Sequence, residues 1–161
     1  MAEEKNKYLT FILGNETYGL PILKVREIIG MMSITHVPGM PEYVKGVINL
    51  RGKIIPVLDL RLKFNFESIE YDDRTCIIIV EINREGKSQL SGLVVDTVWE
   101  VLDIDKDNIE PPPYSGNDNE FLHGIGKAKD KVIMILNTDK IIIKQDTNKI
   151  LALNKSVEVQ N

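Results

Sequence analysis

Side chains that carry out catalysis or bind metals are scarce in this chain of 161 residues. It contains one cysteine, Cys76, and two histidines, His36 and His123. A single thiol excludes an internal disulfide framework and is typical of proteins in a reducing compartment. Neither histidine has metal-ligand spacing to the other or to Cys76, so we expect no metal site and no cofactor. The chain also lacks a paired acid–base motif, which predicts a protein without enzymatic activity.

Long apolar runs and an excess of basic residues are missing as well. No apolar run approaches the roughly 20 residues that span a bilayer, and the polar segment 1–7 lacks the apolar core of a secretory signal. The formal net charge is -4, which argues against nucleic-acid binding because such domains are usually basic. We therefore expect a cytoplasmic protein that binds no nucleic acid and does not insert directly into a membrane.

β-Branched aliphatic residues, in contrast, are abundant, with 22 Ile and 13 Val. They fit a pleated sheet and are poor helix formers. Short apolar runs separated by turn signals such as Gly14-Asn15 and Arg51-Gly52 are typical of a barrel or sandwich. Helical turns are expected at 22–25 after Pro21, at 59–64 and at 138–143. Strands are expected at 8–13, 44–50, 54–58, 76–82, 93–95 and 132–136.

The chain also repeats itself. Residues 18–29 match 91–102 at an offset of 73, and residues 43–59 match 121–137 at an offset of 78. The five extra residues fall in a loop rich in Pro, Gly, Asn and Asp, where insertion costs little. We expect one domain at 8–143, made of copies at about 8–66 and 75–143, with flexible tails at 1–7 and 150–161.

Each copy is interpreted as one small five-stranded barrel. A barrel of that size has a thin core, so we expect the two barrels to pack on a shared apolar core. Strand exchange between the copies is left open, because repeat boundaries do not decide which barrel a strand joins.

Several side chains are candidates for a binding surface. Arg51 falls at a hairpin tip, either as an interface anchor or as a solvated turn residue. Glu27 and Glu100 occupy matching positions of the two copies, either with one in a salt bridge at the rim of the core and the other in an interface contact, or both on a solvated face. The apolar residues Ile22, Val25 and Ile28 share one face if the segment is helical, and Val98 matches Val25 in the second copy. They form either core or a shallow groove for a partner helix.

Three motifs resemble those of the CheW family of chemotaxis coupling proteins. They are Tyr18-Gly-Leu with Val25-x-Glu27-Ile-Ile29, the run Gly46-Val-Ile-Asn49-Leu-Arg-Gly52, and Val57-x-Asp59-Leu-Arg61. The resemblance extends over about 8–143. It implies an all-β fold of two five-stranded SH3-like barrels on a shared apolar core, with short helical turns. It also implies an adaptor that couples transmembrane chemoreceptors to the histidine kinase CheA in cytoplasmic arrays at the inner membrane.

The resemblance assigns partners to particular residues. The cytoplasmic signalling tip of a methyl-accepting chemoreceptor is expected in the groove, and the regulatory domain of CheA and further coupling-protein copies in array rings are the other expected partners. The implied receptor-binding residues are Leu9, Ile22, Val25, Ile28, Val98 and Arg51, and the implied kinase-binding or coupling residues are Glu27, Gly46 and Asn49.

Two other functions stay open from the residues alone. One is a two-barrel module that binds a ligand or a protein without a role in chemotaxis, because paired barrels can enclose a cleft. The other is a minor enzymatic activity, which would require Asp96 and His123 to meet in space.

Overall fold

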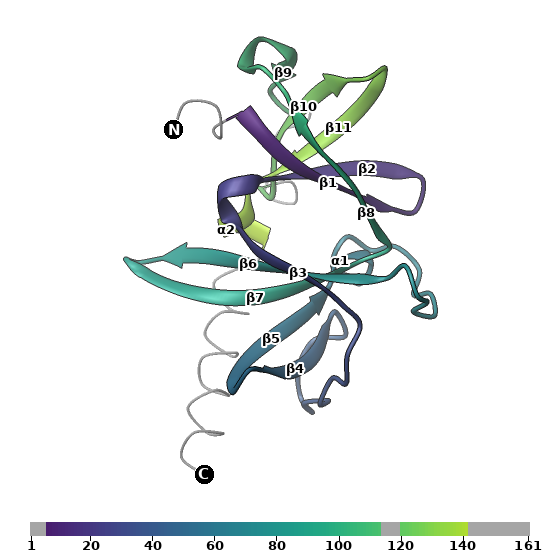
Figure 1. Ribbon diagram of the computed structural model, residues 1–161, viewed down its shortest axis with the longest axis vertical. Helices are drawn as coiled ribbons and strands as arrows, with labels where there is room; N and C mark the ends of the chain where they lie inside the picture. The colour runs from purple at the N-terminus through teal and green to yellow at the C-terminus, as the bar shows by residue number, and fades with distance from the viewer. Residues whose placement is uncertain (1–5, 114–119, 142–161) are drawn as a thin grey trace.

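The computed structural model describes residues 6–113 and 120–141 of the chain. The predicted tails, apart from Asn6 and Lys7, and residues 142–143 of the predicted second copy lie outside these ranges. Two sheets lie one above the other along the long axis (Figure 1), and we call them the upper and lower barrels. The upper barrel has the spatial order β8 (Thr97–Asp103), β1 (Lys7–Leu13), β2 (Glu16–Pro21), β11 (Lys131–Leu136), β10 (Leu122–Ala128) and β9 (Ile109–Glu110). The lower barrel has the order β3 (Val25–Gly30), β6 (Cys76–Arg84), β7 (Lys87–Val95), β5 (Lys53–Asp59) and β4 (Val44–Leu50).

Each sheet closes into a barrel through the segment that follows the first strand in its spatial order, β3 in the lower barrel and β8 in the upper. In the lower barrel, the chain after β3 returns to pair with β4 through Thr35 and Val47. In the upper barrel, β9 follows β8 and pairs with β10 at the corresponding place. The prediction of an all-β fold built from two small barrels is confirmed. The lower sheet has the five predicted strands, whereas the upper has six, because the two-residue strand β9 adds to it.

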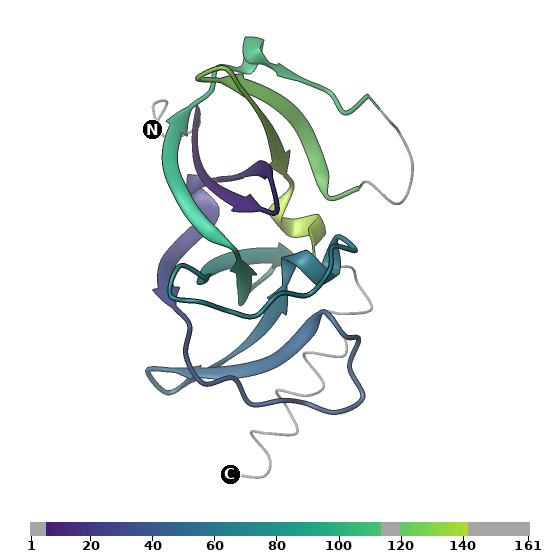
Figure 2. The same cartoon turned by 90° about the vertical axis from the view of Figure 1, so that its right-hand side faces the viewer.

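Short helical turns complete the fold within the described residues. They are η2 (Ile22–Lys24), α1 (Leu60–Lys63), η3 (Lys106–Asn108) and α2 (Thr138–Ile141). Asp59 starts α1, because its carboxylate accepts hydrogen bonds from the backbone N–H groups of Arg61 and Leu62. The helices α1 and α2 occupy matching positions of the two repeats, and both lie between the barrels (Figures 1 and 2).

The barrels do not coincide with the sequence repeats. The β1–β2 hairpin of the first repeat pairs with β8 and β11 of the second, while the β6–β7 hairpin of the second pairs with β3 and β5 of the first. The interpretation of each copy as one barrel is therefore wrong. The two copies carry the same apolar pattern, so a hairpin fits either barrel. The three-residue turn η2 leads from β2 in the upper barrel directly to β3 in the lower one.

The register shows that the exchange is symmetric. The parallel pair of β5 and β7 aligns Val57 with Gly92. The parallel pair of β11 and β2 aligns Ile135 with Gly19, the same two positions of the repeats in exchanged roles. A Cβ atom at Gly92 would lie 2.8 Å from Ile77 Cγ2 of β6 and 3.3 Å from Val57 Cγ2 of β5, so glycine leaves room for side chains of both strands that flank β7.

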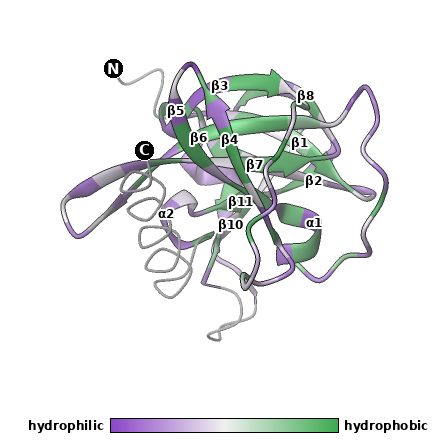
Figure 3. Ribbon diagram, turned by 90° about the horizontal axis from the view of Figure 1, so that it is seen from below, coloured by the Kyte–Doolittle hydropathy of each residue, from purple (hydrophilic) through white to green (hydrophobic). Residues whose placement is uncertain are grey.

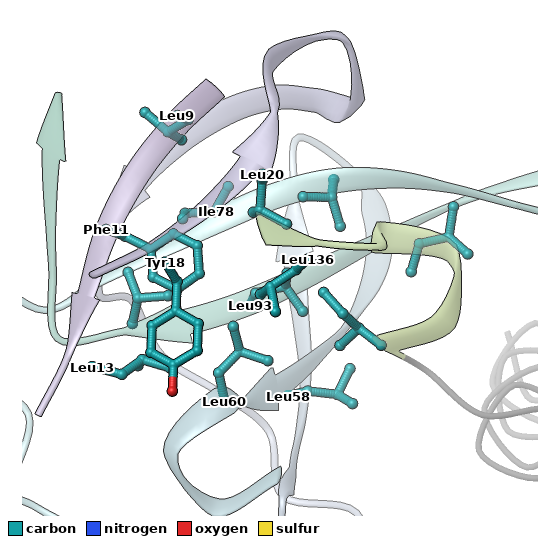
Figure 4. Packing of buried hydrophobic residues seen from close by; sticks show 14 of the residues in the cluster. Leu9, Phe11, Leu13, Tyr18, Leu20, Leu58, Leu60, Ile78, Leu93 and Leu136 are labelled. Carbon is teal, nitrogen blue, oxygen red and sulfur yellow. The ribbon is translucent and has the colours of Figure 1, made fainter. Parts of the chain in front are cut away.

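The largest apolar cluster lies between the barrels (Figure 4), and we call it the inter-barrel cluster. Ile78 and Val80 of β6 belong to it, whereas Ile77 and Ile79 fill the interior of the lower barrel. Both faces of β6 are thus buried, which explains its unbroken apolar run. Figure 3 shows apolar residues concentrated on the central strands and polar residues on the hairpin tips and loops. The buried members of the cluster are Leu9, Phe11, Leu13, Tyr18, Leu20, Val44, Leu58, Leu60, Ile78, Val80, Ile82, Leu93, Val95, Leu136 and Ile141.

Truncation of Ile78 to Ala will destabilise both barrels together. The side chain is fully buried in the inter-barrel cluster, so its loss should cost about 2–5 kcal/mol of unfolding free energy. Chemical denaturation followed by fluorescence and circular dichroism should show one cooperative transition at a lower midpoint. The exposed Val132→Ala variant in β11 should stay within about 0.5 kcal/mol of the parent. Separate transitions for the two barrels would contradict the shared core.

Candidate functional site

Arg51 and Glu27, which were predicted to serve different partners, form one ion pair. Arg51 lies in the β4–β5 turn at φ 52°, and Glu27 lies on β3. The guanidinium Nη2 donates to Glu27 Oε1 at 2.7 Å and also to Oε2. The Arg51 side chain is 72% exposed but that of Glu27 only 25%. Arg51 is therefore the more exposed member of the pair, and Glu27 holds its guanidinium in place.

The ion pair shifts the pKa of both groups. The hydrogen bond from Arg51 lowers the pKa of the Glu27 carboxyl, and Glu27 raises the pKa of Arg51. Glu27 is therefore ionised at neutral pH. The stability that the lowered pKa brings is present above the pKa of the unfolded chain and is lost as pH falls through the folded value.

The second repeat contains a counterpart of this ion pair. Lys129 Nζ lies 2.7 Å from Glu100 Oε1, and both residues match Arg51 and Glu27 in the repeat alignment. Each pair joins a hairpin tip to the edge strand of the same sheet, β3 in the lower barrel and β8 in the upper. The ion pair is thus part of the repeated scaffold, and its presence alone does not mark a partner surface.

The surroundings of the two ion pairs differ. Arg26 on β3 forms an ion pair with Glu81. Trp99 takes the place of Arg26 in the second repeat, and Lys131 Nζ lies 4.0 Å from the centre of the indole ring. One face therefore presents two arginines, and the other presents an aromatic ring with lysines.

Gly46 and Asn49, predicted to bind or couple the kinase, shape the hairpin backbone. Gly46 lies at a β-bulge with φ 143°, and a Cβ atom there would stand 1.9 Å from the carbonyl oxygen of Thr35. Asn49 Oδ1 accepts a hydrogen bond of 2.9 Å from the backbone N–H of Gly52. Asn49 shapes the turn that carries Arg51, and Gly46 lets β4 approach Thr35; the contact of either residue with a kinase stays a prediction.

The predicted groove residues divide into three environments. Ile22, Val25 and Val98 are partly buried against the inter-barrel cluster, and we call these three residues the seam. Leu9 is only 3% exposed within the same cluster, so it belongs to the core and presents no binding surface. Ile28 is 43% exposed.

The prediction of one helical face for Ile22, Val25 and Ile28 is wrong. The helical turn η2 ends at Lys24, and β3 begins at Val25. A β-bulge between Val25 and Glu27 interrupts the alternation of side chains, and Val25 and Ile28 pair with Val80 and Ile78, which both face the inter-barrel cluster. Val25 and Ile28 therefore point to the same face of a strand and do not share a helix. Pro21 does open the turn, but the β-branched residues that follow pair with β6 as a strand.

Two features were not anticipated from the sequence. A groove of about 520 Å³ lies where the β3–β4 connection meets Tyr71, and Met31, Met32 and Met40 contribute to its lining. An ion pair between Arg61 and Asp96 joins α1 to the β7–β8 connection. The only sequence signal for the groove is that the methionines flank a turn. No sequence pattern indicates which carboxylate pairs with Arg61.

The residues considered for enzyme chemistry have other contacts. Asp96 accepts hydrogen bonds from Arg61 and from the backbone N–H of Gly14, and His123 lies exposed on β10. The Cys76 thiol lies 3.2 Å from the carbonyl oxygen of Arg74. Within residues 6–113 and 120–141, no three His, Cys, Asp or Glu side chains gather as a metal site would require. In the same residues no helix is long and apolar enough to cross a membrane.

The Gly46→Ala variant will be strongly destabilised. Its Cβ would overlap the backbone of Thr35 at a φ that favours glycine, so we expect a loss of more than about 2 kcal/mol in unfolding free energy. Gly30→Ala is the matched control, because a Cβ at Gly30 meets nothing within 4 Å. Thermal denaturation of both variants tests this, and equal melting temperatures would contradict the close approach.

The Arg51→Ala variant will raise the pKa of the Glu27 carboxyl toward its ordinary value. The hydrogen bond from Arg51 is the main cause of the lowered pKa, and the variant removes it. A pH titration of the side-chain carboxyl signals by NMR measures the change. Lys129→Ala, which disrupts the matching pair, should leave Glu27 unaffected. An unchanged titration of Glu27 in Arg51→Ala would mean that the ion pair does not persist in solution.

Comparisons with known proteins cover most of the chain. The family model described as CheW-like domain matches residues 7–146. The chemotaxis protein CheW of Helicobacter pylori is 37% identical over 88% of this chain and 84% of its own length. That of Klebsiella aerogenes is 35% identical over 87% of this chain and 83% of its own. The crystal structure of the scaffolding protein TtCheW from Thermoanaerobacter tengcongensis has a TM-score of 0.78 and 42% identity, covering 88% of this chain and 95% of that one.

Proposed function

The chain belongs to the CheW family of chemotaxis proteins, and we propose that it couples transmembrane chemoreceptors to the histidine kinase CheA. The observation that carries the proposal is the match of residues 7–146 to the CheW-like domain. Its cellular place would be the cytoplasm, at receptor arrays on the inner membrane. CheW is an adaptor family, so we propose that this chain has no catalytic activity of its own.

The seam and the Arg51 hairpin tip are the proposed receptor contacts. Ile22, Val25 and Val98 offer a partly buried apolar edge between the barrels, to which the apolar face of a receptor helix can add. Arg51 presents an exposed guanidinium that Glu27 orients. A partner carboxylate can pair with it through two parallel hydrogen bonds.

The regulatory domain of CheA would bind to another part of the lower barrel. The proposal places Gly46 and Asn49 beneath that contact as residues that shape β4 and its turn. Further copies of the coupling protein would use equivalent faces in array rings. Each contact need only be moderate, about -8 kcal/mol for micromolar affinity, because many linked contacts stabilise a lattice.

The alternative of a two-barrel module without a chemotaxis role is not favoured. The family match extends over most of the chain, and the relatives are chemotaxis proteins over nearly the same span.

Arg51→Glu will weaken assembly with the receptor about tenfold or more and leave folding intact. The substitution reverses an exposed charge at the proposed contact, and an interface anchor is worth more than about 1 kcal/mol. Sedimentation of the variant with a purified receptor signalling fragment and a CheA-type kinase, pairwise and together, measures the loss. Unchanged sedimentation would remove Arg51 from the site.

Two further variants separate binding from scaffold. Lys129→Glu makes the same change at the matching position of the upper barrel and should leave receptor binding unchanged. The double variant Glu27→Arg with Arg51→Glu restores an ion pair with exchanged charges. If Arg51 contacts the receptor, the double variant stays defective, whereas full recovery would show that only the ion pair matters.

A further inference from the structure

Within residues 6–113 and 120–141 the chain passes between the barrels twice, and an ion pair joins each passage to a short helix. The first passage is η2, between β2 and β3, and the second is Asp96, between β7 and β8. Lys24 of the first passage pairs with Asp139 of α2, and Asp96 of the second pairs with Arg61 of α1. Both pairs join one repeat to the other.

The two ion pairs are related by the repeat, with their charges exchanged. Arg61 and Asp139 are matching residues at the offset of 78, and Lys24 and Asp96 lie one position apart at the offset of 73. A cation on the helix meets an anion on one passage, and an anion on the helix meets a cation on the other. An ion pair between a short helix of one repeat and a passage of the other therefore occurs twice among the described residues.

The Arg61–Asp96 pair is the firmer of the two. Arg61 Nε and Nη2 donate to separate oxygens of Asp96 at 2.6 and 2.7 Å, and the two side chains are 15% and 17% exposed. Asp96 also accepts from the backbone N–H of Gly14 at 2.8 Å, and Arg61 donates to the carbonyl oxygen of Glu67. A bidentate, mostly buried pair of this kind resists exchange with water.

The Lys24–Asp139 pair is weaker and more accessible. Lys24 Nζ lies 3.3 Å from each carboxylate oxygen, and the two side chains are 27% and 35% exposed. Asp139 Oδ1 also accepts from the backbone N–H of Asn83. Lysine offers a point charge where arginine offers a rigid fork, so this pair opens at a lower cost.

We propose that the two passages are hinges between the barrels, with Arg61–Asp96 as the fixed pivot and Lys24–Asp139 as a latch. Lys24 stands between Ile22 and Val25 of the seam. A receptor helix seated on those residues brings its own acidic side chain beside Lys24 and displaces Asp139. Opening of the latch changes the angle between the barrels, and in this way receptor contact reaches surfaces on the other barrel. The receptor step rests on the proposed function, whereas the latch itself does not.

Distance measurements between the barrels test the latch. Spin labels on Lys53→Cys and Asp107→Cys, both exposed and in different barrels, are introduced in a Cys76→Ala background. Pulsed dipolar spectroscopy should give a narrow distance distribution. Lys24→Met and Asp139→Asn should each widen it at least twofold. The charge exchange Lys24→Asp with Asp139→Lys should restore the narrow distribution, which separates the latch from a general loss of packing.

Lys127→Met is the matched control, because its ion pair with Glu110 lies within the upper barrel, and it should leave the distribution unchanged. A narrow distribution in folded Lys24→Met and Asp139→Asn would overturn the latch. Addition of the purified receptor signalling fragment to the labelled parent should widen the distribution as Lys24→Met does. If the fragment sediments with the protein and the distribution stays narrow, the receptor step is wrong. If the fragment does not bind at all, the proposed function fails, and the variants still decide the latch.

Discussion

The fold depends on apolar packing between the barrels more than within either one. Among the described residues the inter-barrel cluster has 15 buried members, against six inside the lower barrel and five inside the upper. A barrel with so thin an interior has little apolar surface to bury by itself. The strand β6, which faces the cluster on one side and the interior of the lower barrel on the other, is therefore apolar on both sides. The seam and the hairpin that carries Arg51 both belong to strands or turns that pack on this cluster or continue from strands that do.

The exchange of hairpins makes the cluster obligatory. Since the β1–β2 hairpin of the first repeat completes the barrel of the second, the barrels are joined by covalent passages as well as by packing. The short helices α1 and α2 close the space between them and supply the charged groups that hold those passages. A partner that binds at the seam consequently contacts the segments that connect the two barrels.

Local features could be predicted from the sequence, and pairings between distant segments could not. The run 44–50 was predicted as a strand because apolar spacing and turn residues are local signals, and β4 has those bounds. Asp59 and Pro21 likewise indicate where a helical turn begins. The family resemblance supplied the adaptor role and the two-barrel fold. It did not supply the strand exchange, because matching sequences show which positions are equivalent and not which strands pair.

The candidate site was predicted in parts. Arg51 and Glu27 were singled out separately, but their contact depends on how far the hairpin folds over β3. Leu9 was predicted to line a groove, because the sequence does not distinguish an apolar residue in a core from one at the edge of that core. The ion pair of Lys129 and Glu100 shows a further limit. A residue in a family motif can belong to the scaffold, and only its neighbours, such as Arg26 or Trp99, distinguish one face from the other.

The exchanged hairpins also have a consequence for how the chain is divided. A cut between residues 66 and 75 falls in the loop between the repeats, yet neither half would contain a complete barrel. The first half would hold β3, β4 and β5 without the hairpin that joins them, and its own hairpin would have no sheet to enter. Two copies of one repeat could complete each other by trading hairpins. In architecture the protein is a domain-swapped homodimer whose two subunits have been joined into a single chain.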